Sequence, residues 1–126
     1  MKKNVKQAPV FTPDELKAQL HGAFSMCRKA GKLVMGFDPV MDAVMAGKTD
    51  CVYLASDISP KTAQRLRYAV EDLAEVLPLP LAQDDLADVS RKRVAVYAVA
   101  DANLARLCLT KYKQCEHLIQ KEEDSE

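Results

Sequence analysis

A capping residue followed directly by proline occurs three times in this chain, and an apolar run of strand length separates each occurrence from the next. Ser, Thr and Asp side chains satisfy the free amides at a helix start, and Pro fits the first helical position because it has no amide hydrogen to lose there. The sequence therefore predicts helices that begin at Thr12-Pro13, Asp38-Pro39 and Ser59-Pro60. This alternation leaves few possible folds, because each helix must bury its apolar stripe against a sheet.

The boundaries of the elements follow from apolar spacing and from residues that stop a helix. Thr12 and Glu15 match a capping box, and Gly31 and Gly47 are placed to end the first two helices. The helix over 82–90 has the weakest pattern. We expect helices over residues 12–30, 38–46, 59–73, 82–90 and 101–120, and strands over 32–36, 50–55, 76–79 and 93–100.

The length of 126 residues is typical of a single domain. Strands that alternate with helices indicate an α/β fold, in which helices cover both faces of the sheet. We expect a flexible basic tail over residues 1–11, one folded domain over 12–120 and an acidic tail over 121–126.

Charge and hydropathy exclude several classes of protein. Lys and Arg together number 18, and Asp and Glu together also number 18, so the formal net charge is zero. Nucleic-acid binding through overall positive charge is therefore excluded, although a local basic face is not. No apolar run is long enough to cross a bilayer, and the first residues lack the apolar stretch of a secretion signal. The four cysteines match no zinc pattern and are expected to be reduced. We therefore expect a cytoplasmic monomer without a membrane partner.

The chain carries no recognisable catalytic motif. It lacks the glycine-rich loops, the nucleophile elbow and the paired-histidine helix that mark common enzyme classes. Cys115 and His117 have no further metal ligands at useful spacing. We expect no catalytic residue, no metal and no cofactor, so the protein is predicted not to be an enzyme.

Basic residues gather near the expected junctions of strands and helices. Loops at one end of an α/β sheet converge, so groups distant in sequence can form one positive patch that attracts phosphate. Ordinary surface charge is the alternative interpretation. The groups are Arg28, Lys29 and Lys32; Lys61, Arg65 and Arg67; and Arg91, Lys92 and Arg93.

The turn from Gly36 to Pro39 is a second candidate feature. Glycine allows a positive φ or a close approach of a ligand, and the first amides of a helix favour an anion. Phe37 is interpreted as a hydrophobic staple that packs onto the following helix, with an exposed stacking platform as the alternative.

Two segments resemble a known family. Residues 31–48 (Gly-Lys-Leu-Val-Met-Gly-Phe-Asp-Pro-Val, then Ala-Val-Met-Ala-Gly-Lys) and residues 52–62 (Val-Tyr-Leu-Ala-Ser-Asp-Ile-Ser-Pro-Lys-Thr) are similar to the kink-turn RNA-binding ribosomal proteins of the L7Ae and L30e type, closest to the bacterial YlxQ-like branch. The resemblance implies a three-layer α/β/α sandwich with a central four-stranded mixed sheet. It also implies binding of structured RNA, such as a kink-turn or ribosomal RNA, without catalysis.

The resemblance carries over to this chain only in part. Gly36 matches the family's glycine, but Asp38 stands where the family has Asn, Pro39 where it has Glu, and Asp42 where it has Lys. The expected RNA contacts are Lys32, Gly36, Phe37, Asp38, Pro39, Lys61, Arg65, Arg91, Lys92, Arg93 and Val94. The alternative hypothesis is a protein-interaction module on the same fold that has lost kink-turn recognition.

Overall fold

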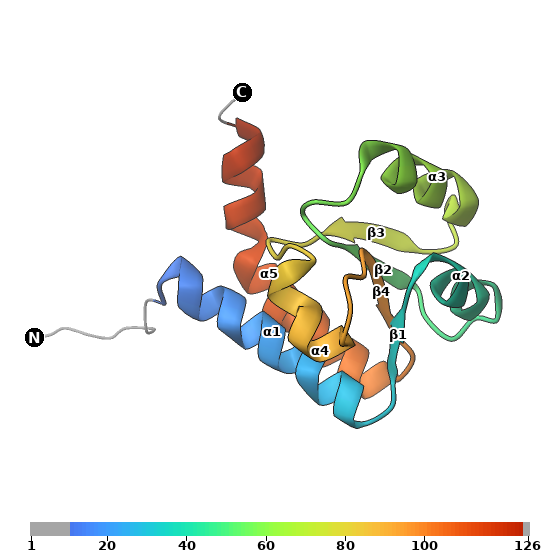
Figure 1. Cartoon of the computed structure of the whole chain (residues 1–126), viewed down its shortest axis with the longest axis horizontal. Helices are drawn as coiled ribbons and strands as arrows, with labels where there is room; N and C mark the ends of the chain where they lie inside the picture. Colours follow the sequence, from blue (N-terminus) through green and yellow to red (C-terminus); the bar gives the residue numbers. More distant parts are fainter. Residues whose placement is uncertain (1–10, 125–126) are drawn as a thin grey trace, which may run out of the picture.

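The computed structural model describes residues 11–124, and it describes side chains as far as residue 117. Helices and strands alternate along the chain, as the three cap-proline pairs predict (Figure 1). The elements are α1 (Pro13–Lys29), β1 (Leu33–Met35), α2 (Phe37–Met45), β2 (Cys51–Leu54), α3 (Pro60–Val70), β3 (Glu75–Pro78), the 3₁₀ turn η2 (Asp84–Leu86), α4 (Ala87–Ser90), β4 (Val96–Val99) and α5 (Ala102–Asp124).

The four strands form one mixed sheet in the order β1-β4-β2-β3. Strand β4 is antiparallel to both of its neighbours, whereas β2 and β3 are parallel. In the centre of the sheet Tyr53 of β2 lies opposite Tyr97 of β4. The predicted four-stranded mixed sheet is therefore confirmed.

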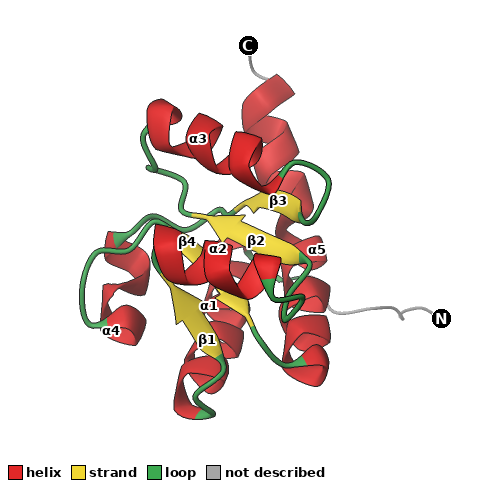
Figure 2. Ribbon diagram, turned by 90° about the vertical axis from the view of Figure 1, so that its right-hand side faces the viewer, coloured by secondary structure: helices red, strands yellow, loops and turns green. Residues whose placement is uncertain are grey.

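Helices cover both faces of the sheet, which gives the three layers of an α/β/α sandwich. Side chains of α1, α4 and α5 pack with Cys51, Tyr53, Tyr97 and Val99 on one face. Helices α2 and α3 pack on the opposite face, against the alternate residues of the same strands (Figure 2). This division follows from the two-residue period of a strand, which points successive side chains to opposite faces.

Four aromatic rings bind the α1 and α5 layer to the sheet. Phe24 of α1 packs edge-on to Tyr53 at 5.3 Å between ring centroids and stacks on Tyr97 at 6.0 Å. Tyr112 of α5 meets Tyr53 edge-on at 5.8 Å. All four residues are buried, and pairs of this geometry are worth about 0.5–1.5 kcal/mol each beyond the area that they bury.

Two of the three predicted helix caps are confirmed. The Thr12 hydroxyl accepts from the Glu15 amide at 3.1 Å while the Glu15 carboxylate accepts from the Thr12 amide at 2.8 Å. The Ser59 hydroxyl accepts from the Thr62 amide at 3.1 Å. Gly31 also has the expected left-handed conformation after α1, with φ 72°.

The predicted start of the second helix is wrong. The N-cap of α2 is Gly36, so Asp38 and Pro39 lie inside the first turn, and Asp38 makes no capping hydrogen bond. The Gly36 amide donates to the Val96 carbonyl at 2.8 Å and the Gly36 carbonyl accepts from the Val40 amide at 3.1 Å. Pro39 fits there because first-turn amides have no partner within the helix. The staple interpretation of Phe37 is also wrong, because Phe37 is the first residue of α2 rather than a residue ahead of its cap.

Other boundaries differ by a few residues. Strand β4 begins at Val96, because residues 93–95 belong to the loop that approaches it. Helix α3 ends at Val70, where Glu71 turns to φ 49°. Helix α5 runs to Asp124 and so continues into the segment expected to be the acidic tail, whereas residues 1–10 of the expected basic tail lie outside the described residues. Within residues 11–124, no helix is both long and apolar enough to cross a membrane.

Replacement of Gly36 by Ala should lower the free energy of unfolding by about 1–3 kcal/mol, because φ 102° with ψ 156° is a conformation that only glycine adopts without strain. The added methyl group would lie at an ordinary contact distance of 3.5 Å from Pro39, so the cost comes from the backbone. Urea unfolding followed by circular dichroism measures the change.

Gly22→Ala is the matched control for this substitution. Gly22 lies inside α1 with no atom near the position of an added methyl group, so alanine should raise the free energy of unfolding by about 0.5–1 kcal/mol. Equal effects of the two substitutions would contradict the role assigned to Gly36.

Candidate functional site

Three segments that are distant in sequence meet at one end of the sheet, around the entry to β4. The Gly36 amide bonds to the Val96 carbonyl, the Ala55 amide bonds to the Ala95 carbonyl at 2.9 Å, and the Ser56 amide bonds to the Leu81 carbonyl at 2.8 Å. We call the surface formed by residues 36–39, 56–65 and 90–95 the β4-entry surface.

Phe37 and Arg65 join the two helix starts of this surface. The Arg65 guanidinium lies 4.8 Å above the centre of the Phe37 ring, in a cation–π contact. Phe37 is half-buried on the core between the sheet and α2 and α3, so its ring is a fixed base for the exposed arginine. Such a contact is worth about 0.5–1 kcal/mol at an exposed site, and it holds the guanidinium over α2.

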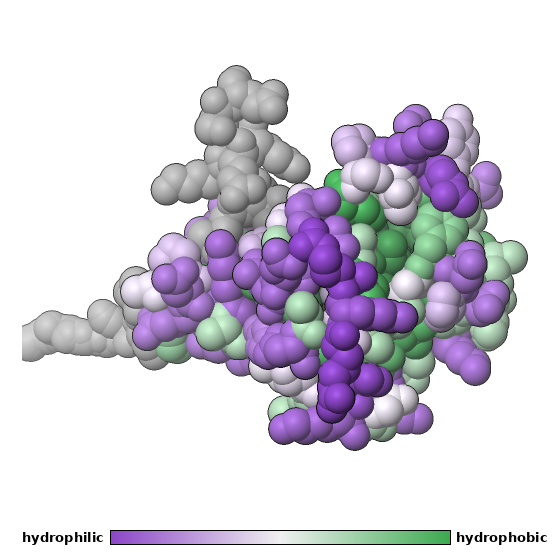
Figure 3. Space-filling view, in the orientation of Figure 1, coloured by the Kyte–Doolittle hydropathy of each residue, from purple (hydrophilic) through white to green (hydrophobic). Residues whose placement is uncertain are grey.

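Ile58 and Ala95 belong to the same surface, and sequence reasoning missed them. Both are half-buried apolar residues at the edge of the core that Phe37 also contacts. Figure 3 shows an apolar hollow between α2 and α3 on one side and hydrophilic side chains over α4 and the segment after it on the other. The only signal in the sequence is the isolated Ile58 in an otherwise polar turn.

The Ser90–Val94 loop is held at both ends. The Ser90 hydroxyl donates to the Leu86 carbonyl at 3.1 Å and also contacts the Lys92 carbonyl. Val94 is 6% exposed, and its carbonyl accepts from the Tyr97 hydroxyl at 2.7 Å. Val94 therefore anchors the loop in the core, while Arg91 and Lys92 are exposed.

Arg93 is already paired with acidic side chains. One guanidinium nitrogen contacts the Asp84 carboxylate, and the other lies 3.5 Å from Asp57 Oδ2. The second oxygen of Asp57 accepts from the Gln83 amide at 3.0 Å, and this hydrogen bond lowers the pKa of the Asp57 carboxyl below its ordinary value. Arg93 thus shares its charge with two carboxylates, so it offers less positive charge to a ligand than its sequence position indicates.

The structure does not gather all the basic groups into one patch. Lys32 lies at the opposite end of β1 from Gly36, where its carbonyl accepts from the Ala100 amide at 2.9 Å. At about 3.3 Å per residue, the two Cα atoms are separated by about 13 Å of strand. Arg28 donates to the Val89 carbonyl at 3.2 Å. The exposed cations of the β4-entry surface are therefore Lys61, Arg65, Arg91 and Lys92, together with the paired Arg93.

The remaining polar candidates have structural contacts or lie apart. His21 Nε2 of α1 is 2.9 Å from the Asp88 carboxylate of α4, and this hydrogen bond lowers the pKa of Asp88. All four cysteines are buried free thiols. Across the described residues, no three His, Cys, Asp or Glu side chains are grouped so that they could hold a metal ion.

Comparison with protein families assigns the chain to a class. A model of the Ribosomal protein L7Ae/L30e/S12e/Gadd45 family matches residues 18–126. The chain belongs to this family, and the family predicted from the residues around Gly36 is confirmed. The YlxQ-like branch stays a prediction. A search of curated protein sequences found no match.

Solved structures share the fold. A protein with unknown function from Bacillus halodurans C has a TM-score of 0.68 and 22% identity, and the match covers 76% of this chain and 98% of that one. The Giardia lamblia 15.5kD RNA binding protein has a TM-score of 0.65 and 19% identity, with 86% and 93% covered. At these identities the similarity concerns the α/β/α architecture.

Replacement of Asp57 by Ala should destabilise the protein in a pH-dependent way. The pKa of the Asp57 carboxyl is lower in the folded protein than in the unfolded chain, where it has its ordinary value of about 4. Asp57 therefore stabilises the fold above this ordinary value, and the stabilisation is lost as the pH falls through the lowered pKa. The difference in melting temperature between wild type and Asp57→Ala should therefore be present at pH 7 and disappear in acid. Asp57→Asn keeps an acceptor for the Gln83 amide and separates the hydrogen bond from the charge.

Proposed function

We propose that the protein binds structured RNA through the β4-entry surface and performs no catalysis. One observation carries this proposal: exposed cations of α3 and of the Ser90–Val94 loop lie on the same surface as an apolar hollow and the start of α2, whose N-cap is Gly36. Membership in a ribosomal protein family and the likeness to a protein described as RNA-binding support it. We further propose that it acts as a cytoplasmic monomer.

The parts of the surface suit different parts of an RNA. Lys61, Arg65, Arg91 and Lys92 are placed to neutralise phosphates, which gives affinity without reading sequence. The amides of Phe37 and Asp38 in the first turn of α2 can add donors for an anion, since the Gly36 amide is bonded to Val96 and Pro39 has none. The apolar hollow between these cations suits the face of an unstacked base, which requires no specific donor or acceptor.

Specific base recognition is weaker than in a basic member of such a family. Asp38 is exposed and accepts hydrogen bonds only, Pro39 has no polar side chain, and Asp42 adds a negative charge one turn further along α2. We propose that a kinked RNA, ribosomal RNA among the candidates, is recognised mainly through its backbone shape. Lys32 and Val94 are left out of the proposed contacts, because one lies at the far end of β1 and the other is buried.

Binding is tested by gel shift with a kink-turn RNA and a straight duplex at several salt concentrations. The kink-turn should bind more tightly, and the affinity should fall steeply with salt. Arg91→Ala with Lys92→Ala should weaken binding and reduce the slope of log affinity against log salt by about 2, since each cation contributes about 1. Lys61→Ala with Arg65→Ala should do the same.

The matched control is Lys29→Ala with Lys113→Ala, two exposed cations outside the β4-entry surface. This pair should leave both the affinity and the salt slope unchanged. If wild-type protein binds neither RNA, the proposal fails and the protein-interaction alternative gains support.

Asp42→Lys should tighten RNA binding, because it replaces a negative charge one turn beyond Asp38 by a positive one. We expect an increase in affinity of about tenfold at low salt that shrinks as salt is added. The same gel shift measures it. An unchanged affinity would mean that RNA does not approach α2 near Asp42.

A further inference from the structure

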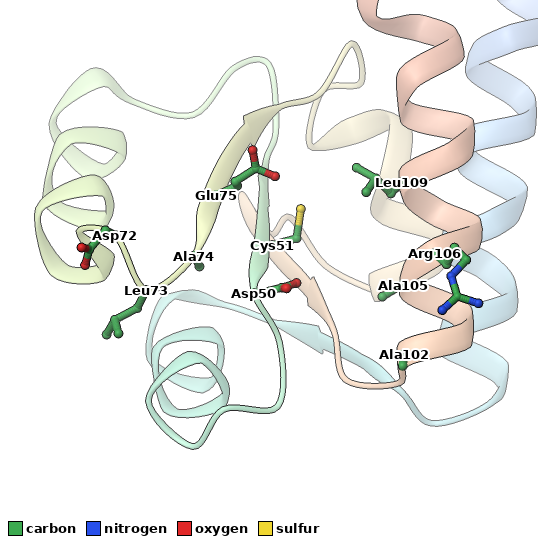
Figure 4. A pocket seen from close by; sticks show the side chains of 10 residues that line it. All are labelled: Asp50, Cys51, Asp72, Leu73, Ala74, Glu75, Ala102, Ala105, Arg106 and Leu109. Atoms are coloured by element: carbon green, nitrogen blue, oxygen red, sulfur yellow. The ribbon is translucent and has the colours of Figure 1, made fainter.

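A second concave surface lies at the opposite end of the sheet from the β4-entry surface. A cavity of about 770 Å³ opens between the start of β2, the segment that joins α3 to β3, and the first half of α5 (Figure 4). A cavity of about 580 Å³ adjoins it toward the end of α2 and shares Asp50, Leu73, Ala102 and Ala105 with it. We call the two together the α5 groove.

Apolar side chains in the α5 groove are open to solvent. Leu73 is 53% exposed and Met45 is 67% exposed, and both line the groove. Leu109 and Ala105 of α5 line the opposite side of the larger cavity (Figure 4). Burial raises the pKa of the Cys51 thiol to about 11, so this part of the lining is uncharged at neutral pH. A partner that covers these side chains would gain the free energy of removing them from water.

The groove is acidic, although the chain as a whole is neutral. Asp50, Asp72, Glu75 and Asp101 line it, against two cations, Lys48 and Arg106. Among residues whose side chains are described, none of these carboxylates forms a salt bridge. Asp101 accepts from the Leu104 amide at 3.0 Å at the start of α5. The charge of the other three carboxylates is available to a basic partner, and it opposes the approach of a phosphate backbone.

The neighbouring sheet edge restricts how a partner can dock. Strand β3 is an edge strand, and Pro78 within it has no amide hydrogen. Proline at an edge removes a donor that an added strand would need. Extension of the sheet beside Pro78 is therefore disfavoured, and docking in the groove is expected to depend mainly on side chains.

We propose that the α5 groove binds a Lys- and Arg-rich protein segment that carries apolar side chains. The apolar side chains pack against Leu73 and Leu109, and the basic side chains pair with Asp50, Asp72 and Glu75. Because the groove and the β4-entry surface lie at opposite ends of the sheet, one molecule can hold both partners at once. The proposal does not depend on RNA binding.

The probe is a fluorescein-labelled peptide of four Lys-Leu-Lys repeats, with Lys-Ser-Lys and Glu-Leu-Glu peptides of equal length as comparisons. Fluorescence anisotropy with the full chain at low and high salt gives the affinities, and amide chemical shifts locate the site. The Lys-Leu-Lys peptide should bind most tightly and shift the amides of residues 50–51, 72–75 and 102–109.

Two variants separate charge from apolar contact. Asp72→Lys with Glu75→Lys should weaken binding of the Lys-Leu-Lys peptide by about tenfold or more at low salt. Leu73→Ser should weaken it at both salt concentrations, and it should leave the fold intact because the side chain is exposed. The matched control is Asp14→Lys with Glu116→Lys, which makes the same change of charge outside the groove and should leave the affinity unchanged.

Each other outcome overturns the proposal. It fails if no peptide binds, if the Lys-Ser-Lys or Glu-Leu-Glu peptide binds equally well, or if the control pair weakens binding as much as the groove pair. It also fails if the kink-turn RNA displaces the Lys-Leu-Lys peptide and shifts the groove amides, since the groove would then belong to RNA.

Discussion

Burial of β4 on every side is the constraint from which the rest of the structure follows. The strand lies between β1 and β2 and is covered by helices on both faces, so residues 96–99 are at most 2% exposed. The last strand of the chain therefore lies between two strands, β1 and β2, that come much earlier in the sequence. The segment that leads into β4 and the segment that leaves it lie at opposite ends of the sheet. The first contributes to the β4-entry surface and the second to the α5 groove.

The distribution of charge follows from this arrangement. The protein has no net charge, yet exposed cations gather at the entry to β4 and carboxylates gather where β4 leads into α5. Opposite charges at two ends of a compact molecule allow it to attract an anionic and a cationic partner without competition between them. A net charge of zero therefore excludes neither an anionic nor a cationic partner.

Local physics determined most of what could be predicted from sequence. The capping box at Thr12, the cap at Ser59 and the stop at Gly31 depend on residues within one helical turn, so their positions could be derived without the fold. The start of α2 could not, because the Gly36 amide is fixed by the carbonyl of Val96, sixty residues away. A capping signal at Asp38 was therefore overruled by a tertiary hydrogen bond.

The sequence by itself determined the alternation of elements, the α/β class, the family and the identity of the basic groups, because each depends on local pattern. Only the tertiary structure decided which cations share a surface, since that depends on the order of the strands. It removed Lys32, which lies at the wrong end of β1, and it paired Arg93 with Asp57 and Asp84 from other segments. It also created the α5 groove, whose lining comes from three separate parts of the chain, residues 44–51, 72–75 and 99–109, that only the fold brings together.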